Sequence, residues 1–189
     1  MKNKRNLFVV LGAVAVVLTV GAVSFFGGNG EYKGAFVNFG NVRVVQDNPV
    51  TKAEFAVMLV QNLNLPLSPA CNTFSDVPVD VWYNQSVCTL AANNIIVGFA
   101  DATFRPQQLL DRATAARFIQ VAYGVNYNCP LPKLFSDLDS NAWYFESVNQ
   151  LAARSLFVTD VSIGGNFKPL ASLTRGAAQK WFAQAANLR

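Results

Sequence analysis

The chain begins with a short basic segment followed by a long apolar run. Residues 7–26 contain no charged side chain, and only Gly, Thr and Ser interrupt the hydrophobic residues. As a helix rising about 1.5 Å per residue, this run reaches ~30 Å, enough to cross the hydrocarbon core of a bilayer. The basic residues Lys2, Lys4 and Arg5 predict that the N-terminus stays in the cytoplasm and that the rest is exported. We therefore expect an N-terminal hydrophobic helix that contacts the membrane and a body outside the cytoplasm.

Two fates of this helix remain open. Ala22-Val23-Ser24 offers a small-x-small cleavage site, which favours a removed signal peptide. The run is longer than an ordinary signal-peptide core and continues through Phe25 and Phe26, which favours an uncleaved anchor. Residues 1–26 are thus predicted to be a signal peptide or a transmembrane anchor. Residues 27–43, which start with Gly-Gly-Asn-Gly, are predicted to be a flexible linker.

Beyond the linker, apolar residues recur at the spacing of amphipathic helices. Tyr83, Val87, Leu90 and Ala91 follow the i, i+4, i+7, i+8 pattern, and a matching series follows at an offset of 61. A second type of helix occurs three times, with bulky residues in the same phase each time. The residues that share this phase are Phe55, Met58 and Leu59; Ala115, Phe118 and Ile119; and Ala178, Trp181 and Phe182. Their equivalence predicts a shared core of three related helices.

Short motifs repeat along the same stretch of chain. Phe-Ser-Asp-Val at 74–77 recurs as Phe-Ser-Asp-Leu at 135–138, an offset of 61. Phe-Arg-Pro at 104–106 recurs as Phe-Lys-Pro at 167–169, an offset of 63. The segment 49–55 aligns with the residues around Arg112 at an offset of 60, but it has no upstream half.

These matches divide the chain into one partial repeat and two complete ones. We place the partial repeat at residues 44–67 and the complete repeats at 68–127 and 128–189. Each complete unit has the pattern of a helix, a loop and a second helix. Because one such unit cannot bury its apolar stripe alone, the copies must pack on one another. The predicted fold is all-α, with helix-loop-helix repeats packed as a pseudo-threefold bundle.

Charge and residue content exclude several functional classes. The chain has 15 Lys and Arg, 11 Asp and Glu and no His, so its formal charge is +4, and without the three basic residues of the leader it is +1. So small a positive charge does not favour a nucleic-acid partner. Without His, neither a Ser-His-Asp triad nor an imidazole metal site can form. We predict a protein that is not an enzyme and needs no cofactor or metal.

The three cysteines agree with an exported protein. Cys71 and Cys88 bracket one turn-plus-helix unit, and we favour them as a disulfide pair. Closing a loop of that size would contribute about 3 kcal/mol in the chain-entropy model. The alternative is that all three cysteines are buried free thiols.

Each of the three related helices carries a cation next to its N-terminal cap. Thr51, Asp111 and Thr174 are the predicted caps, and the residues that follow them are Lys52, Arg112 and Arg175. A helix N-terminus already carries about half a positive charge, so a cation there needs a compensating anion. An internal carboxylate could supply it, the candidates being Asp76, Asp101, Asp137 and Asp160. Alternatively, the cation and free helix-start amides form a pocket for an external carboxylate or phosphate.

The tryptophans also have two interpretations. Trp82 and Trp143 occupy equivalent positions at predicted helix starts, just after an Asp-containing turn. Each is either a buried anchor or a flat platform for the apolar face of a sugar ring. Trp181 occupies the position equivalent to Phe118 in its helix and is predicted to belong to the core.

The order of these motifs resembles the S-layer homology (SLH) domain, whose pattern is F-x-D-V, W, a G-I-V-x-G-like turn, F-x-P and L-T-R-A-x-x-A. The matching segments are Phe74–Val77, Trp82, Ile95–Gly98, Phe104–Pro106 and Leu110–Ala113, and the resemblance covers residues 44–188. It implies a pseudo-trimer that binds cell-wall polymers without covalent attachment, typically a secondary polysaccharide with pyruvate ketals or a peptidoglycan-linked polymer. It also implies site residues: Lys52, Arg112 and Arg175 as the cations, Trp82 and Trp143 as aromatic partners, and Asp76 and Asp137 as turn-shaping residues.

The chain also departs from the family pattern. The first unit lacks its Trp helix, and the Glu of the T-R-A-E motif survives only as Glu54. Gly98 has no equal in the last unit, where Thr159 falls, and the first cation is Lys, which cannot form a planar fork on a carboxylate. We therefore expect fewer than three working sites, with Arg112 the best formed.

Taken with the resemblance, these features predict a non-enzymatic module of the cell envelope that binds anionic wall glycan. An alternative is a membrane-tethered interaction subunit or homo-oligomer. In that case Phe55, Met58 and Leu59, left without a sequence-local partner by the missing half repeat, would recruit another helix.

Overall fold

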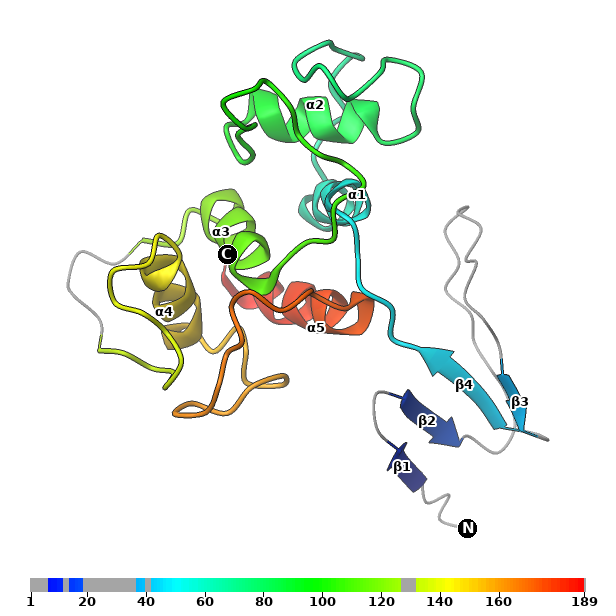
Figure 1. Ribbon diagram of the computed structural model, residues 1–189, viewed down its shortest axis with the longest axis vertical. Helices are drawn as coiled ribbons and strands as arrows, with labels where there is room; N and C mark the ends of the chain where they lie inside the picture. The colour runs from blue at the N-terminus through cyan, green and yellow to red at the C-terminus, as the bar shows by residue number, and fades with distance from the viewer. Residues whose placement is uncertain (1–6, 12–13, 19–36, 40–41, 127–131, 189) are drawn as a thin grey trace. The chain divides into compact units, whose positions relative to one another are not determined.

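The computed structural model divides into two units, Met1–Asn48 and Pro49–Arg189 (Figure 1). It describes residues 7–11, 14–18, 37–39, 42–126 and 132–188. The first unit contains a four-stranded antiparallel sheet in the order β1-β2-β4-β3. Its strands are β1 (Leu7–Leu11), β2 (Val14–Leu18), β3 (Val37–Phe39) and β4 (Val42–Gln46).

The predicted N-terminal helix over residues 7–26 is wrong for the part of that run the structure describes. β1 and β2 pair from Leu7 opposite Leu18 to Leu11 opposite Val14. Both strands are rich in valine, whose branched side chain loses rotamer freedom in a helix and suits a strand. No helix within the described ranges is long and apolar enough to span a membrane. The predicted cleavage site lies outside these ranges, and β3 falls within the predicted linker.

The second unit is helical, which confirms the predicted all-α class. Its described residues form α1 (Lys52–Leu63), α2 (Asn84–Ala92), α3 (Arg112–Ala122), α4 (Phe145–Ala153), α5 (Arg175–Ala185) and the 3-10 turn η1 (Ala186–Leu188). The three predicted caps are confirmed: Thr51, Asp111 and Thr174 are the N-cap residues of α1, α3 and α5. Each cap side chain accepts a hydrogen bond from the amide three residues on, which satisfies one of the amides left open at a helix start.

Three backbone hydrogen bonds close a ring where these helices begin. Val50, Leu110 and Leu173 each precede a helix cap, and all three are fully buried. Val50 N donates to Leu173 O (2.9 Å), Leu173 N donates to Leu110 O (2.7 Å) and Leu110 N donates to Val50 O (2.9 Å). Every copy of the repeat thus donates one bond and accepts one. The ring gives the unit its pseudo-threefold centre.

Aromatic side chains extend the core from this centre. α1 packs against both α3 and α5, and the Phe55 ring lies 5.3 Å from that of Phe182 and 6.4 Å from that of Phe118. Most members of the predicted triplets are fully buried: Phe55, Leu59, Ala115, Ile119, Ala178 and Trp181. The sequence phase therefore identified the core correctly.

Two further helices pack outside this centre, α2 against α1 and α4 against α3 (Figure 1). The first helix of each complete repeat thus packs on the second helix of the copy before it. The predicted unpartnered face on α1 is consequently wrong, because Phe55 and Leu59 are fully buried and Met58 is partly buried. Phe55 packs on the Phe118 ring of α3 and the Phe182 ring of α5, so the later copies of the repeat cover this face in place of the missing half repeat.

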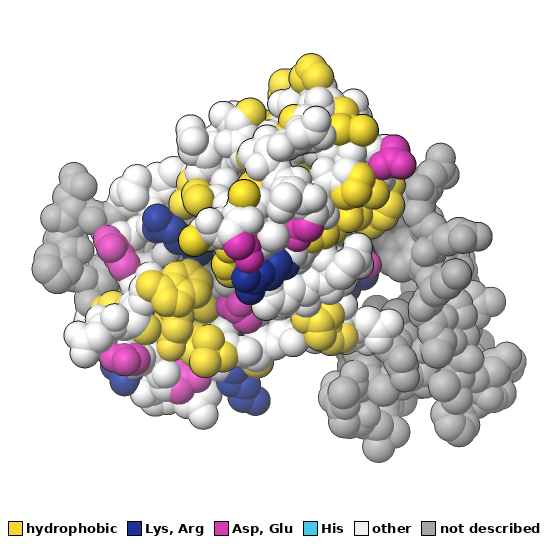
Figure 2. All heavy atoms as spheres, turned by 45° about the horizontal axis from the view of Figure 1, so that its top comes forward, with side chains coloured by type: hydrophobic (Ala, Val, Ile, Leu, Met, Phe, Trp, Pro, Cys, Tyr) yellow, Lys and Arg dark blue, Asp and Glu magenta, His cyan; other side chains and the backbone are white. Residues whose placement is uncertain are grey.

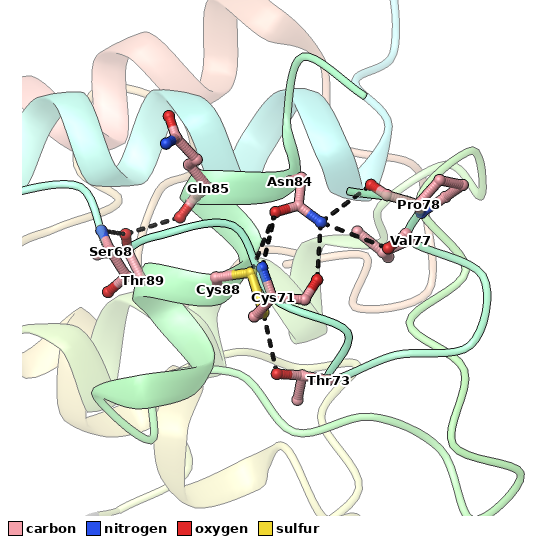
Figure 3. The surroundings of a disulfide bond; sticks show 9 residues. All are labelled: Ser68, Cys71, Thr73, Val77, Pro78, Asn84, Gln85, Cys88 and Thr89. Carbon is pink, nitrogen blue, oxygen red and sulfur yellow. Dashed lines mark hydrogen bonds between the residues drawn. A yellow bond between two sulfur atoms is a disulfide. The ribbon is translucent and has the colours of Figure 1, made fainter. Parts of the chain in front are cut away.

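A disulfide ties the segment before α2 to that helix (Figure 3). Cys71 and Cys88, the pair that the sequence favours, are bonded and 17 residues apart in the chain. The Asn84 side chain donates to Cys71 O (3.0 Å) and Pro78 O (2.9 Å) and accepts from Cys71 N (3.2 Å). Thr73 donates its hydroxyl to the Cys71 sulfur, since a disulfide sulfur carries no proton. Cys129 lies outside the described residues.

The next copy replaces this covalent link with a hydrogen bond. Asn149 occupies the position equivalent to Cys88, at an offset of 61. Its Oδ1 accepts the amide of Leu134 (3.0 Å), so a side chain at the same helical position again holds the preceding segment.

Replacing Leu110 with alanine tests the packing of the core around the ring. We expect Leu110→Ala to lower the free energy of unfolding by about 2–5 kcal/mol, since it removes a fully buried side chain and leaves a cavity. Leu109→Ala is the matched control, because Leu109 is 49% exposed and should cost at most about 0.5 kcal/mol. Urea unfolding measures both. Equal effects would contradict the central position of Leu110.

Reducing the disulfide should lower the free energy of unfolding by about 3 kcal/mol, because the unfolded chain regains the freedom of the closed loop. The measurement is urea unfolding with and without reductant. Cys129→Ser should respond to reductant as the unaltered chain does. A midpoint that reductant does not shift would show that the bond contributes nothing.

Candidate functional site: cations at the helix starts

The first amides of α1 are all engaged within the protein. Lys52 N donates to Gln108 O (2.9 Å) and Ala53 N to Pro106 O (3.0 Å), both in the loop of the following copy. Glu54 N donates to the hydroxyl of Thr51 (3.2 Å), and the Glu54 carboxylate accepts the Thr51 amide, which completes a capping box. These groups are buried or partly buried and need acceptors, which the neighbouring loop supplies.

α3 begins in the same way. Arg112 N donates to Ala171 O (3.0 Å) and Ala113 N donates to Pro169 O (2.9 Å), again in the loop of the next copy. Thr114 N donates to the Asp111 carboxylate (2.7 Å). The predicted anion pocket made of free helix-start amides is therefore wrong for α1 and α3. Any anion at these positions must be held by side chains.

The loop that caps α1 is shaped by Asp76. Its two carboxylate oxygens accept the amides of Phe104 (2.8 Å) and Arg105 (2.7 Å), and the Phe74 and Phe104 rings stack at 5.5 Å. Arg105 has a left-handed backbone (φ 61°), and the bond to Asp76 offsets the strain of that conformation. Asp137 repeats the arrangement with the amides of Phe167 and Lys168. Both aspartates therefore hold the backbone of their turns.

Close packing explains the glycine before this loop. A Cβ atom on Gly98 would lie 2.5 Å from the Phe74 ring and 2.9 Å from the carbonyl oxygen of Thr103. Neither the stacked ring nor the backbone can move away freely, so only glycine fits.

Arg112 is neutralised inside the protein. Its Nη1 lies 2.7 Å from the Asp160 carboxylate, and its Nε donates to Phe167 O (2.7 Å). The guanidinium lies 4.7 Å from the ring centre of Phe167 and 4.9 Å from that of Trp181, whose indole N–H also donates to Asp160 (3.2 Å). The internal-carboxylate interpretation therefore applies to Arg112, the position that we expected to be the best-formed external site.

Arg175 also has an internal carboxylate. Its Nη2 lies 2.7 Å from Glu54 of α1, and the two side chains are 27% and 32% exposed. The carboxylate is Glu54 rather than one of the aspartates considered from the sequence. The pair joins the start of α5 to α1, and Glu54 serves both this ion pair and the capping box.

Lys52 differs from both arginines. No carboxylate within the described ranges forms an ion pair with it, although the residue is only 6% exposed. Its Nζ lies 4.3 Å from the ring centre of Phe99, and the Arg105 guanidinium lies 3.8 Å from the same ring. Asp76 and Asp111 are near enough to affect Lys52, but the oxygens of Asp76 accept two backbone amides and those of Asp111 accept the amide and the hydroxyl of Thr114. Two cations thus share one aromatic ring, and one of them lacks a carboxylate partner among the described residues.

The electrostatics of Lys52 reflect this arrangement. Burial lowers the pKa of Lys52 below 10.5, and Arg105 lowers it further. Asp111 and Asp76 oppose the shift without removing it. Arg105 itself is paired with Asp101 (3.2 Å) at the exposed edge of the loop. Phe99 and Arg105 were not identified from the sequence as site residues, although Arg105 stands within the repeated F-x-P motif.

The two tryptophans lie on the surface, so the buried-anchor interpretation is wrong. Trp82 is 68% exposed and Trp143 is 61% exposed, and each meets the neighbouring tyrosine edge to face. Trp181 is fully buried, as predicted. Exposed hydrophobic side chains form several patches on the face in Figure 2, next to basic and acidic ones. The indoles are thus accessible, as an aromatic platform requires.

Comparisons with known proteins agree with this repeat organisation. Residues 73–116 and 134–178 match the family model of the S-layer homology domain. These matches confirm the resemblance to the S-layer homology domain that the sequence motifs indicated. The partial repeat at 44–67 lies outside both matches.

Several cell-surface proteins are similar to this chain. The middle cell wall protein of Brevibacillus brevis is 32% identical over 98 residues, which are 50% of this chain and 9% of that protein. The S-layer protein sap of Bacillus anthracis is 28% identical over 139 residues, 71% of this chain and 16% of that protein. The outer membrane protein SlpA of Thermus thermophilus is 50% identical over 46 residues, 24% of this chain and 5% of that protein.

The chain spans less than a fifth of the length of each of these relatives. The SLH matches and the relatives indicate a protein of the cell envelope. A cell wall amidase of Bacillus anthracis is also similar, at 29% identity, over 21% of its length.

Replacing Lys52 with methionine should stabilise the fold at neutral pH. Because the pKa of Lys52 is lower in the folded protein than in the unfolded chain, its charge opposes folding at pH 7. That penalty shrinks as the pH rises through the folded-state pKa towards 10.5. We expect Lys52→Met to unfold at higher urea concentration than the unaltered chain at pH 7, with a smaller difference at pH 10. Lys133→Met, at an exposed position, is the control. A less stable Lys52→Met protein at pH 7 would contradict this account.

Proposed function

We propose that this chain attaches to the cell wall by binding an anionic glycan at the start of α1. The observation that carries the proposal is the Lys52 ammonium, a desolvated cation without an ion-pair partner among the described residues, beside Phe99 and Arg105. A carboxylate on a sugar, such as a pyruvate ketal, would supply the missing negative charge. Phe99, 41% exposed, would contact the apolar face of that sugar.

The exposed tryptophans support a polymeric ligand. Trp82 and Trp143 are equivalent residues of two complete repeats, and both indoles are accessible. Stacking of successive sugar rings on such platforms favours a polysaccharide over a small anion. Contacts of this kind are individually weak, so attachment would gain strength from several engaged at once.

The helix starts limit how many anions the chain can hold. Arg112 and Arg175 are each paired with an internal carboxylate, so the Lys52 region is the position best prepared for an external one. The proposed role is non-enzymatic: the aspartates suggested by the repeat motif hold backbone amides rather than face a common substrate space. Secondary wall polysaccharide or peptidoglycan-linked glycan are the proposed partners.

Retention of the full chain on isolated cell walls tests this proposal. We expect Lys52→Met to lower the affinity roughly tenfold, the effect of losing one charge-assisted contact. Trp82→Ala should also weaken binding, whereas Lys133→Met should bind as the unaltered chain does. Because Lys52→Met is expected to be at least as stable as the original, lost binding cannot be ascribed to unfolding.

Walls whose pyruvate ketals have been removed by mild acid identify the anion. The unaltered chain should bind these walls about as weakly as Lys52→Met binds intact walls. Equal retention of all variants on both kinds of wall would rule out a glycan site at Lys52.

A further inference from the structure

Two equivalent helix starts differ in the residue that faces their cation. Lys52 and Arg112 are equivalent at an offset of 60, and Phe99 and Asp160 are equivalent at an offset of 61. Lys52 lies over the Phe99 ring, whereas Arg112 forms an ion pair with Asp160. The same loop position of the following copy therefore presents an aromatic ring in one case and a carboxylate in the other.

The surroundings of Arg112 offer more hydrogen-bond donors than Asp160 uses. One oxygen of Asp160 accepts both from Arg112 Nη1 (2.7 Å) and from the Trp181 indole (3.2 Å). Arg112 Nη2 is buried and has no hydrogen-bond partner in the described part of the chain. An untethered carboxylate could accept from both Nη atoms in the two-pronged geometry that arginine favours. The side chain of Asp160 is 18% exposed, so the pair borders the surface.

We infer that the start of α3 is a carboxylate-binding site that the chain fills with its own Asp160. The site consists of the Arg112 guanidinium, the Trp181 indole N–H and the flanking ring of Phe167. Asp160 thereby determines that Lys52, and not Arg112, accepts an external anion. The inference assumes that carboxylates are the ligands at the starts of both α1 and α3, and in this respect it rests on the proposed function.

Removing the internal carboxylate and supplying a free one tests the inference without any glycan. In the full chain, Asp160→Ala leaves Arg112 buried and unpaired, and we expect its Tm to fall by roughly 10 °C. Sodium acetate should restore much of that loss in a saturable way, whereas sodium chloride of equal ionic strength and neutral acetamide should not. The unaltered chain, whose Arg112 site is filled, should gain only the smaller stabilisation that acetate at Lys52 gives to every variant. Failure of this test leaves the Lys52 proposal intact, because wall binding is measured separately.

Three further variants separate a filled site from a merely structural contact. Asp80→Ala removes an exposed aspartate away from both cation sites and should respond to acetate no more than the unaltered chain does. Arg112→Met combined with Asp160→Ala should also respond no more than the unaltered chain, since the binding cation is gone. Asp160→Asn keeps the shape but not the charge, and its Tm should fall as well. An Asp160→Asn protein as stable as the original, or acetate stabilisation equal in all variants, would overturn the inference. So would an Asp160→Ala protein that acetate neither stabilises nor helps to fold.

Discussion

Backbone groups buried where α1, α3 and α5 begin need hydrogen-bond partners, and each finds them in another copy of the repeat. Val50, Leu110 and Leu173 satisfy one another in a closed ring, so no copy can complete its own helix start. An unpaired buried amide or carbonyl costs free energy comparable to a lost hydrogen bond. This requirement explains why the partial repeat consists of a second half: that half contributes the third member of the ring.

The same requirement determines the chemistry of the helix starts. The F-x-P loops supply carbonyl oxygens to the first amides of α1 and α3, which leaves no amide there for an external anion. Each cation beside a cap must therefore be balanced by a side chain, and the three copies do so differently. Asp160 pairs with Arg112, Glu54 pairs with Arg175, and Lys52 packs on an aromatic ring without a carboxylate partner in the described part of the chain. Copies with similar backbones thus surround their cations with different side chains.

Local hydrogen bonds and the disulfide hold the loops that contact the helix starts. The Asp76 carboxylate holds the left-handed turn at Arg105, and that turn directs the neighbouring carbonyl groups towards α1. The Cys71–Cys88 bond fixes the segment before α2, and Asn149 does the equivalent task in the next copy. The repeated residues of the chain are therefore mostly those that shape loops and helix starts. The residues that distinguish one helix start from another, such as Asp160 and Glu54, differ between the copies.

The sequence by itself determined the helical class of the repeat unit, its caps and its core, because apolar periodicity and capping residues act over a few positions. It also indicated the disulfide pair, since both cysteines flank one local unit. Only the tertiary structure decided which cations pair with an internal carboxylate. Asp160 and Glu54 each pair with an arginine that belongs to a different copy of the repeat, and no local pattern encodes such pairings. Local sequence was also insufficient for the apolar N-terminal run. Whether β1 and β2 form depends on the strands with which they pair, and the pattern of apolar residues does not reveal these partners.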